Sequence, residues 1–355
     1  MKRLLVHTPP MLLEELAERD VDLVALHHSF QRPKEETCAR LRANESFEVR
    51  AKSDIRAIAS MRRLIEKHRP DLVHAFSHRG LAAAVLATIG MKQPPAIMSF
   101  RCISTRPSLL DPANHITFFS RRVPVHACET DAAANGLVAA GIARDRCHTV
   151  YNCVHQPDRM TPATRAEIRA RFGIPADAFV IFTIATIRPV KGIDLLMEAA
   201  LRCSDLTDVH WLIIGEQTER DSRIGRLKAD PRWQGRLHMP GSVAKAGSLA
   251  GAFDLFVMPS RHEGICRAML EAMAWGICPV VSDAGGMKEI VRHGIDGEVV
   301  PREDVAALAS AIRRLHADRE AIMAFGESSR KRMADLCTPR AFADRVLDLH
   351  ARVAA

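Results

Sequence analysis

The sequence predicts an α/β fold in which two doubly wound units follow one another along the chain. Short apolar runs alternate with segments of helical period through most of the sequence, the order typical of parallel sheets with helices on both faces. The chain has 355 residues, which suits two domains of about 150–180 residues better than a single core. A proline-containing break near the middle separates the first alternation from the second.

The first alternation fills the N-terminal half. Its strand candidates are RLLVH (3–7), VDLVALHH (21–28), DLVHAF (71–76), PAIMSF (95–100) and VPVHACET (123–130). Its helix candidates are LLEELAERD (12–20), SDIRAIASMRRLIEKHRP (53–70), the Ala-rich LAAAVLATIGM (81–91) and DAAANGLVAAG (131–141). In the longest of these, apolar residues recur at positions 55, 58, 61, 64 and 65, which is the period of a helix.

The second alternation begins after the break. The break, residues 151–178, holds three prolines and is interpreted as the domain linker. Beyond it the strand candidates are FVIFTIAT (179–186), DVHWLIIG (208–215), RLHMPG (236–241), DLFVMPS (254–260), CPVVSD (278–283) and GEVVP (297–301). We therefore expect two Rossmann-like domains, residues 1–160 and 161–335, that face a ligand-binding cleft, and a C-terminal helix at 336–355 that crosses back to the first domain.

The composition is typical of a globular protein. Hydrophobic residues make up 47% of the chain and charged residues 26%. No apolar run approaches the roughly 18–20 residues of a membrane-spanning helix, and MKRLLVHTPP lacks the apolar core of a signal peptide. None of the nine cysteines forms a CxxC pair, so we expect reduced thiols, no metal site and a cytoplasmic location.

The net charge of +8 is unevenly spread. Residues 1–160 hold 23 Lys and Arg against 17 Asp and Glu, whereas residues 161–355 hold 27 against 25. The basic first half favours an anionic partner such as a membrane surface or a phosphorylated acceptor, although a solvated arginine-rich surface explains it equally well. Aromatic residues make up only 5% and form no visible stacking platform, so nucleic acid is not expected as a partner.

Two glutamates stand eight positions apart in PSRHEGICRAMLEAMAWG (259–276). In a helix that begins near Glu263, eight residues turn by about 800°, which leaves Glu271 within about 80° of Glu263 and about 12 Å further along. The N–H groups of residues 264–266 would be unpaired donors at the helix N-terminus, which suit phosphate. An acid that stabilises the helix dipole, followed by a solvent-exposed glutamate, is the alternative.

Two cations follow another predicted strand. Arg188 and Lys191 lie in TIRPVKGIDLLMEA (186–199), between a buried strand and a helix. Arginine can bind two phosphate oxygens at once and lysine adds a point charge, so the pair suits a diphosphate. Two surface cations beside a helix start are the alternative. Because the cations and the glutamates lie at strand ends of one predicted sheet, ligand binding is the better interpretation.

At these residues the sequence resembles a known family. The signature blocks of retaining glycosyltransferases of family 4, which have the GT-B fold, are similar to RPVKG (188–192), EGICRAMLEAMA (263–274) and SDAGGMKEIVRHGIDG (282–297). The family's order of strands and loops is also matched by WLIIGEQ (211–217) and MPGSVAK (239–245). The N-terminal half is similar by pattern, through DLVHAFSHRG (71–80) and the hinge-like YNCVH (151–155).

The resemblance implies roles for individual residues. Arg188 and Lys191 would hold the donor diphosphate and stabilise the leaving group, and Glu263 would contact the donor sugar. The further donor-binding residues it implies are Glu271 at the ribose, Gly264, Ile265 and Cys266 in a phosphate cradle, Val243 at the base, and Gly215. The family needs no metal, because a fixed Arg/Lys pair can neutralise a departing nucleotide diphosphate. No cofactor is expected, since the nucleotide sugar is a substrate.

Departures from the family pattern concern mainly the acceptor. The stretch after the first strand reads HTPPM (7–11), without the family's glycines, and Arg101 replaces a frequent histidine. Cys266 stands where Gly or Pro is common, and the hinge reads YNCVH. The expected acceptor-binding residues are Arg101, Arg106, Ser77 and His78. Arg101 and Arg106 are expected in a loop over the cleft, where they could bind an anionic acceptor.

Two other groups of candidates have less specific interpretations. His7, His74 and His78 lie at or near strand ends that face the predicted cleft, where a hydrogen-bonded structural histidine is at least as good an interpretation. Asp20 and Asp22 form a D-x-D, a metal–diphosphate motif of a different transferase fold. Here it spans a helix end and a strand start, so we do not expect it to be functional.

The predicted function is transfer of a sugar from a nucleotide diphosphate sugar to a hydroxyl acceptor, with retention of configuration. The basic N-terminal half and the family resemblance favour a lipid-linked or lipopolysaccharide-core acceptor, and peripheral contact with the anionic inner face of a membrane. Two alternatives remain open. A nucleotide-sugar epimerase on the same fold would turn over without an acceptor, and a non-catalytic binding subunit would bind the nucleotide without transfer.

Overall fold

The computed structural model describes residues 1–19, 21–219 and 221–354, which form two compact units. Unit 1 comprises Met1–Cys153 together with the C-terminal segment from Pro339, and unit 2 comprises Val154–Thr338. The first division therefore falls after residue 153 rather than after 160, and the C-terminal segment joins unit 1 from residue 339 rather than from 336.

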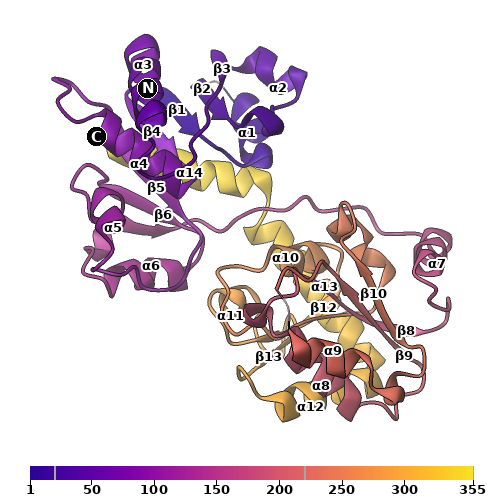
Figure 1. Ribbon diagram of the computed structural model, residues 1–355. Helices are drawn as coiled ribbons and strands as arrows, with labels where there is room; N and C mark the ends of the chain where they lie inside the picture. Colours follow the sequence, from indigo (N-terminus) through magenta and orange to yellow (C-terminus); the bar gives the residue numbers. More distant parts are fainter. Residues whose placement is uncertain (20, 220, 355) are drawn as a thin grey trace. The chain divides into compact units, whose positions relative to one another are not determined.

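Unit 1 is built on a seven-stranded parallel sheet with the order β3-β2-β1-β4-β5-β6-β7 (Figure 1). Its strands are β1 (Lys2–Val6), β2 (Asp22–His27), β3 (Ala43–Ser46), β4 (Leu72–Ala75), β5 (Ala96–Arg101), β6 (Val125–Cys128) and β7 (Cys147–Thr149). The chain builds outward from β1 in one direction and then returns to place β4 on its other side. Ligands of such sheets bind outside the carboxyl ends of the strands, where the order reverses.

Helices cover both faces of this sheet. Those of unit 1 are α1 (Pro10–Ala17), α2 (Glu35–Arg40), α3 (Ile55–His68), α4 (His78–Ala87), α5 (Pro112–Ile116), α6 (Asp131–Val138) and α14 (Pro339–Ala354), with short 3-10 turns η1 (Ser29–Gln31) and η2 (Arg144–Arg146). The side chains of β1 alternate between the faces. Leu4 and Val6 pack with α3, α4 and α6, whereas Leu5 packs with α1 and α14.

The last helix, α14, completes the core of unit 1 although it lies at the far end of the sequence (Figure 1). Its buried face consists of Phe342, Ala343, Val346 and Leu349. On the same face, His350 is fully buried, and its Nε2 lies 3.0 Å from Nδ1 of the fully buried His74 in β4. Burial lowers the pKa of His74 well below the usual value and that of His350 to about 3, so both rings are neutral near pH 7.

This pair predicts a loss of stability in mild acid. In the folded chain the pKa of such a histidine is lowered, whereas in the unfolded chain it is near 6.5. As the pH falls below this value, only the unfolded chain takes up the proton. The free energy of unfolding therefore decreases in acid. Each such group contributes up to about 1.4 kcal/mol per pH unit. Urea unfolding at pH 7.5 and pH 5.0 should show a large decrease in stability, and the decrease should be smaller in His350→Gln. An equal decrease in both proteins would contradict this role.

Unit 2 is built on a six-stranded sheet with the order β10-β9-β8-β11-β12-β13, also parallel throughout. Its strands are β8 (Phe179–Ile184), β9 (Val209–Ile214), β10 (Leu237–Gly241), β11 (Leu255–Met258), β12 (Cys278–Ser282) and β13 (Glu298–Val300). The strand order reverses between β8 and β11. The prediction of two doubly wound units is thus confirmed.

The helices of unit 2 also lie on both faces of its sheet. They are α7 (Pro162–Arg171), α8 (Ile193–Arg202), α9 (Ser222–Lys228), α10 (Arg267–Ala274), α11 (Met287–Ile290), α12 (Val305–Ala317) and α13 (Arg319–Leu336), with the 3-10 turns η3 (Pro189–Lys191), η4 (Pro231–Trp233) and η5 (Ala246–Ala252). α8 and α12 share one core with the sheet, and α10 and α13 pack together against β11 and β12.

Several sequence-based expectations differ from this fold. The interval 151–178, expected to be a linker, contains α7, whose buried Arg169 is anchored to Asp254 at 2.8 Å and so ties the helix to unit 2. Asp20 of the D-x-D lies outside the described residues, and Asp22 begins β2. Among residues 1–19, 21–219 and 221–354, no helix is long and apolar enough to cross a membrane.

Candidate functional site

The strand reversal of unit 2 brings two predicted site residues together. Lys191 ends the segment that follows β8, and Glu263 lies in the segment that follows β11. Lys191 Nζ lies 2.6 Å from Glu263 Oε2, and the side chains are only 19% and 11% exposed. Ser260 Oγ donates a second hydrogen bond to the same oxygen at 3.1 Å. A cation and a carboxylate therefore meet at the point of the sheet where ligands of this architecture bind.

Two glycines allow these loops to approach so closely. Gly192 has φ = 65°, and a Cβ there would lie 2.1 Å from the carbonyl oxygen of Pro259. Gly285 has φ = 55°, and its Cβ would lie 1.8 Å from the carbonyl oxygen of Glu263. Both positions require a left-handed backbone and leave no room for a side chain. The loops after β8 and β12 are thereby packed against the loop that carries Glu263.

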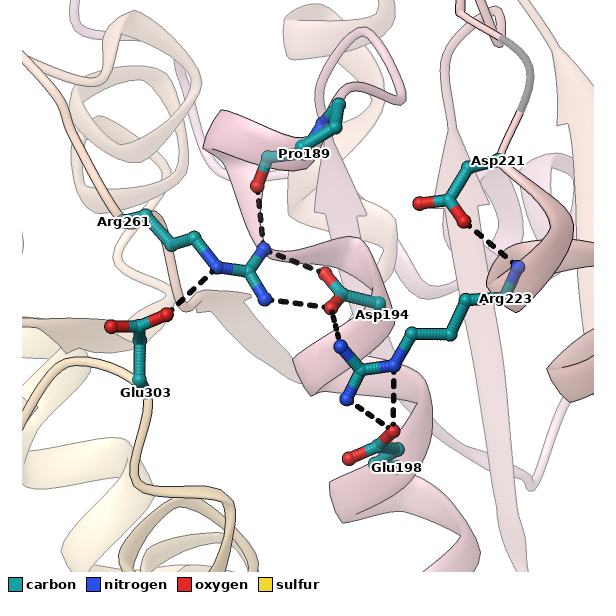
Figure 2. Close-up of polar contacts among 7 residues, drawn as sticks. All are labelled: Pro189, Asp194, Glu198, Asp221, Arg223, Arg261 and Glu303. Carbon is teal, nitrogen blue, oxygen red and sulfur yellow. Dashed lines mark hydrogen bonds and ion pairs between the residues drawn. The ribbon is translucent and has the colours of Figure 1, made fainter.

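Arg261 fixes the same loops through its guanidinium group (Figure 2). It donates to the carbonyl oxygen of Pro189 at 2.6 Å and to both carboxylate oxygens of Asp194, at 2.9 and 2.7 Å. Its backbone N–H donates to the carbonyl oxygen of Val190 at 2.9 Å. Lys191 directly follows these two carbonyls, so Arg261 holds the turn that delivers the lysine to Glu263.

Asp194 is the buried centre of this network. Arg223 donates to Asp194 Oδ2 at 2.7 Å and also contacts Glu198, and Arg261 reaches Glu303 at 3.1 Å (Figure 2). Burial alone would raise the pKa of Asp194, but the hydrogen bonds and charge of Arg261, together with the charge of Arg223, outweigh burial, and the pKa is lowered. Asp194 is therefore ionised at neutral pH and binds two arginines at once.

This network predicts that Arg261 contributes more to stability than an exposed arginine does. Arg261→Ala should lower the free energy of unfolding of unit 2 by about 1.5–3 kcal/mol, the usual contribution of hydrogen bonds to charged groups. Arg302→Ala is the matched control, because Arg302 forms a more exposed pair with Asp283 at 3.0 Å, and exposed pairs contribute about 0–1 kcal/mol. Urea unfolding measures both, and equal effects would argue against this role of Arg261.

The structure corrects the expected helix around Glu263. α10 begins at Arg267 with Cys266 as its N-cap, so Glu263 lies in a loop and the eight-residue helical rotation does not apply. Gly264 is held outside the helix because its carbonyl accepts from the N–H of Gly286 at 2.8 Å. Burial raises the pKa of the Cys266 thiol to about 12, with a further contribution from Glu263, so Cys266 is a neutral packing residue.

The other predicted donor residues differ in their exposure and in the contacts they make. Arg188 lies three residues before Lys191 and is exposed, and its side chain makes no hydrogen bond or ion pair with any residue the structure describes. Ile265 is buried beside Cys266. Glu271 lies in α10 and pairs with Arg267 at 3.1 Å.

The predicted residues after β9 and β10 extend the site. The backbone N–H of Gly215 donates to the carbonyl of Gly241 at 2.9 Å, which joins the ends of β9 and β10. Val243 follows β10 and is partly exposed. A Cβ on Gly247 would lie 1.9 Å from Glu271 Oε2, so Glu271 borders the start of η5, close to Val243 in sequence.

The strand reversal of unit 1 carries a second polar group. Ser77 Oγ lies 2.7 Å from His7 Nδ1 and accepts from the N–H of Gly80 at 3.1 Å. His7 Nε2 lies 3.0 Å from the carbonyl oxygen of Phe47, which can only accept. Nε2 therefore carries the proton, and the Ser77 hydroxyl donates to Nδ1. His7 adopts φ = 56°, which is uncommon for a residue other than glycine.

The remaining acceptor candidates fall in different environments. Arg101 is not in a surface loop as expected: it is the last residue of β5, is buried, and donates to the carbonyl of Thr105 at 2.5 Å. Arg106 is exposed in the following loop. His78 is partly buried as the first residue of α4, and burial lowers its pKa to about 4. His74 is fully buried within β4, so it does not reach the site.

The sequence alone does not indicate a role for Arg261, Asp194 and Arg223. Asp194 and Arg261 are 67 residues apart and Asp194 and Arg223 are 29 apart, so no local spacing indicates that they meet. One weak signal was present, since Arg261 lies within PSRHEGICRAMLEAMAWG (259–276), two residues before Glu263. Among residues 1–19, 21–219 and 221–354, no group of three or more His, Cys, Asp or Glu side chains is arranged to hold a metal ion.

Family models match both halves of the chain. The model "Glycosyl transferases group 1" matches residues 164–332, and the model "Glycosyltransferase Family 4" matches residues 11–156. The chain therefore belongs to the family 4 glycosyltransferases, as the motifs at Arg188, Lys191, Glu263 and Glu271 predicted.

Curated relatives match about half of the chain. The D-inositol 3-phosphate glycosyltransferase 1 of Catenulispora acidiphila is 32% identical over 198 residues, which cover 52% of this chain and 47% of that protein. The lipopolysaccharide core biosynthesis glycosyltransferase LpsE of Rhizobium meliloti is 29% identical over 181 residues, which cover 51% and 52%. The chain thus spans about half the length of these relatives.

Solved structures match over nearly the whole chain. A glycosyltransferase from Rickettsia africae has a TM-score of 0.83 at 16% identity, covering 99% of this chain and 98% of that one. Anabaena HepE, solved in complex with UDP and glucose, has a TM-score of 0.77 at 17% identity and covers 99% of both chains. At this identity the likeness shows the fold, which is the GT-B architecture.

Proposed function

We propose that the chain is a retaining glycosyltransferase that moves a sugar from a nucleotide diphosphate sugar to a hydroxyl acceptor. The observation that carries this proposal is the contact between Lys191 and Glu263 at the strand reversal of unit 2, with the exposed Arg188 on the same loop. A cation that suits a diphosphate thus lies next to a carboxylate that suits a sugar, which supports the proposal. The family match supports the same activity.

Lys191 and Arg188 would act on the leaving group. The bond from the sugar to the diphosphate breaks with negative charge building on the β-phosphate, and fixed cations stabilise that charge without reorganising. In the proposed complex, Lys191 gives up part of its contact with Glu263 and binds phosphate oxygens. Arg188, which is exposed, binds the phosphates from the solvent side. Two protein cations supply the neutralisation for which other transferases use a metal, so we propose a metal-independent reaction without a cofactor.

Glu263 would position the donor sugar. Its carboxylate is fixed by Lys191 and Ser260, and a carboxylate accepts hydrogen bonds from sugar hydroxyls. We propose that Gly264, Ile265 and Cys266 present backbone N–H groups to the phosphates, that Glu271 accepts from the ribose, and that Val243 and Gly215 line the nucleoside. Because configuration is retained in the family, the leaving phosphate takes the acceptor proton on the same face, and no protein nucleophile is assigned.

The acceptor would bind to unit 1. His7 and Ser77 meet at the strand reversal of that sheet, the position at which ligands of doubly wound sheets bind. His78 and Arg106 follow strands that end at the same edge. The buried Arg101 would act by supporting the loop through Thr105 rather than by direct contact.

We propose a lipid-linked or lipopolysaccharide-core acceptor, reached from the cytoplasmic face of a membrane. The excess of basic residues in the first half of the chain supports this, as does the relative LpsE, which is named for lipopolysaccharide core biosynthesis. A uridine diphosphate sugar is the first donor to test, because Anabaena HepE was solved with UDP and with UDP-glucose.

The donor class can be tested by thermal stability. UDP, GDP and ADP should be compared with the nucleosides, since a ligand that binds only the folded chain raises its melting temperature. The sugar nucleotide of the stabilising base is then supplied with and without a membrane extract as a source of acceptor. Transfer that needs the extract supports a glycosyltransferase, conversion of the sugar without an acceptor indicates an epimerase, and nucleotide binding alone indicates a non-catalytic subunit.

Removing either cation should reduce turnover. Lys191→Ala and Arg188→Ala are each expected to lower kcat by about 10²–10³, which corresponds to about 2.7–4 kcal/mol of charge stabilisation in comparable sites. Initial rates of nucleoside diphosphate release measure the effect. Lys228→Ala removes an exposed lysine from α9 and should leave the rate unchanged. Unchanged turnover in both site variants would contradict the assignment.

Glu271→Ala should act on binding rather than on the chemical step. A ribose hydrogen bond to Glu271 would be present in the ground state and the transition state alike, so its loss raises KM for the donor and changes kcat little. Steady-state kinetics with varied donor concentration separate the two parameters. A loss confined to kcat would place Glu271 at the reacting centre instead.

A further inference from the structure

Large apolar side chains are exposed in three segments that follow strands β2, β3 and β5 of unit 1. Phe30 is 76% exposed, Ile55 80% and Leu110 92%. Ile103 and Leu109 are also exposed, in the same segment as Leu110. Because the sheet is parallel, all three segments leave its carboxyl edge. We call residues 28–34, 47–56 and 102–111 the apolar edge of unit 1.

The three segments contact one another. The N–H of Ser29 donates to Glu48 Oε1 at 2.6 Å, which joins the first segment to the second. Lys52 Nζ lies 3.6 Å from Asp111 Oδ2, which joins the second to the third. The segments that carry the exposed apolar residues are therefore in contact with one another at one edge of the sheet.

The apolar edge is also cationic. Its segments hold six Lys and Arg against three Asp and Glu. All three acids are held by backbone N–H groups, because Glu48 accepts from Ser29, Asp54 from Ala57 and Asp111 from Ala113. The basic residues without an ion pair to any described residue are Arg32, Arg50, Arg56 and Arg106, all exposed.

In the turn that carries Leu109 and Leu110, side chains close by in the sequence bind three backbone polar groups. Asn114 Nδ2 donates to the carbonyl of Ser108 at 2.9 Å, and His115 Nε2 lies 2.7 Å from the carbonyl of Leu109. The N–H of Leu110 donates to Ser108 Oγ at 3.1 Å. A segment that enters lipid has no water for its N–H and C=O groups and must satisfy them internally. These three bonds reduce the number of backbone groups that the turn would bring into lipid without a partner, while it exposes two leucines.

We propose that the apolar edge docks unit 1 on the surface of an anionic lipid bilayer. Leu109, Leu110 and Ile55 would enter the interface between headgroups and acyl chains, and the unpaired arginines would bind lipid phosphates. Apolar side chains surrounded by unpaired cations suit this surface better than a protein partner, which would need acids opposite each arginine. The inference rests on the proposed membrane-bound acceptor and names the surface that reaches it.

Docking at this edge would place the acceptor site at the membrane. His7 and Ser77 lie at the carboxyl ends of β1 and β4, between the strands that carry the apolar edge. The ring of Phe30 stacks on His28 at 5.1 Å, and His28 stacks on His7 at 3.7 Å. The exposed edge is thus connected by ring contacts to the acceptor site, and a headgroup-linked hydroxyl need not leave the bilayer.

Vesicle co-sedimentation of the full chain tests the proposal. The wild-type chain should bind vesicles of 30% phosphatidylglycerol in phosphatidylcholine, bind pure phosphatidylcholine at least tenfold less, and dissociate as salt is raised. Leu109→Ser with Leu110→Ser should weaken partitioning about tenfold or more, since the buried apolar area is lost. Arg50→Gln with Arg106→Gln should weaken it about 25-fold, at about fivefold per cation.

Matched variants separate the apolar edge from general hydrophobicity and charge. Ile89→Ser and Met323→Ser remove exposed apolar side chains elsewhere, and Arg226→Gln with Lys228→Gln removes two exposed cations of α9. These controls should retain wild-type vesicle binding. Equal losses in controls and edge variants, or no binding to anionic vesicles at all, would overturn the proposal. Vesicle binding that is lost with the leucines but insensitive to the arginines would overturn the assignment to an anionic surface, because apolar insertion alone would then explain it.

Nucleoside diphosphate binding is measured on the same samples without vesicles. If the chain binds UDP but not vesicles, the docking surface is wrong and the transferase proposal stands. If it binds vesicles but no nucleoside diphosphate, the reverse holds. Circular dichroism melting of each variant confirms that the exposed substitutions leave the fold intact.

Discussion

The ion pair between Lys191 and Glu263 is the contact on which the proposed chemistry depends. Neither side chain is on a strand; each lies on a loop at the reversal of a parallel sheet, and they meet at 2.6 Å because glycines at 192 and 285 remove the side chains that would keep the loops apart. Arg261 and Asp194 then fix the turn before Lys191. The sheet positions the two loops, the glycines let them approach closely, and Arg261 holds the turn before Lys191 in place. An electrostatic site needs its charged groups fixed in this way.

The two units use the same architectural feature for different chemistry. In unit 2 the strand reversal joins a cation and a carboxylate, which suits a diphosphate and a sugar. In unit 1 the corresponding reversal joins His7 and Ser77 as a neutral hydrogen-bonded pair, and exposed apolar and basic residues surround it. A charged donor would thus bind at the strand ends of unit 2, and an amphiphilic acceptor at those of unit 1. The core of unit 1 is completed by α14, from the end of the sequence.

Much of the fold and the centre of the site could be predicted because they follow apolar periodicity. Lys191 and Glu263 were identified since each follows a strongly apolar strand. β3 was missed because its sequence, ANES, is polar and marks an edge strand. The start of α10 was misplaced because the bond between Gly264 and Gly286 is a tertiary contact. Arg101 was expected on the surface because a charged residue is rarely buried without a carboxylate partner. It is buried instead, with its guanidinium carbon 4.5 Å from the centre of the Phe118 ring, a tertiary contact that the sequence does not show.

The central claim is that Lys191 and its loop form a diphosphate site. It is tested most directly by titration calorimetry of nucleoside diphosphate against nucleoside monophosphate, using the base that stabilises the chain most. The account predicts that the wild-type chain prefers the diphosphate and that Lys191→Ala loses most of that preference, by about 10–100-fold for one charged contact. A variant that keeps the full preference would show that the second phosphate binds elsewhere and would contradict the account.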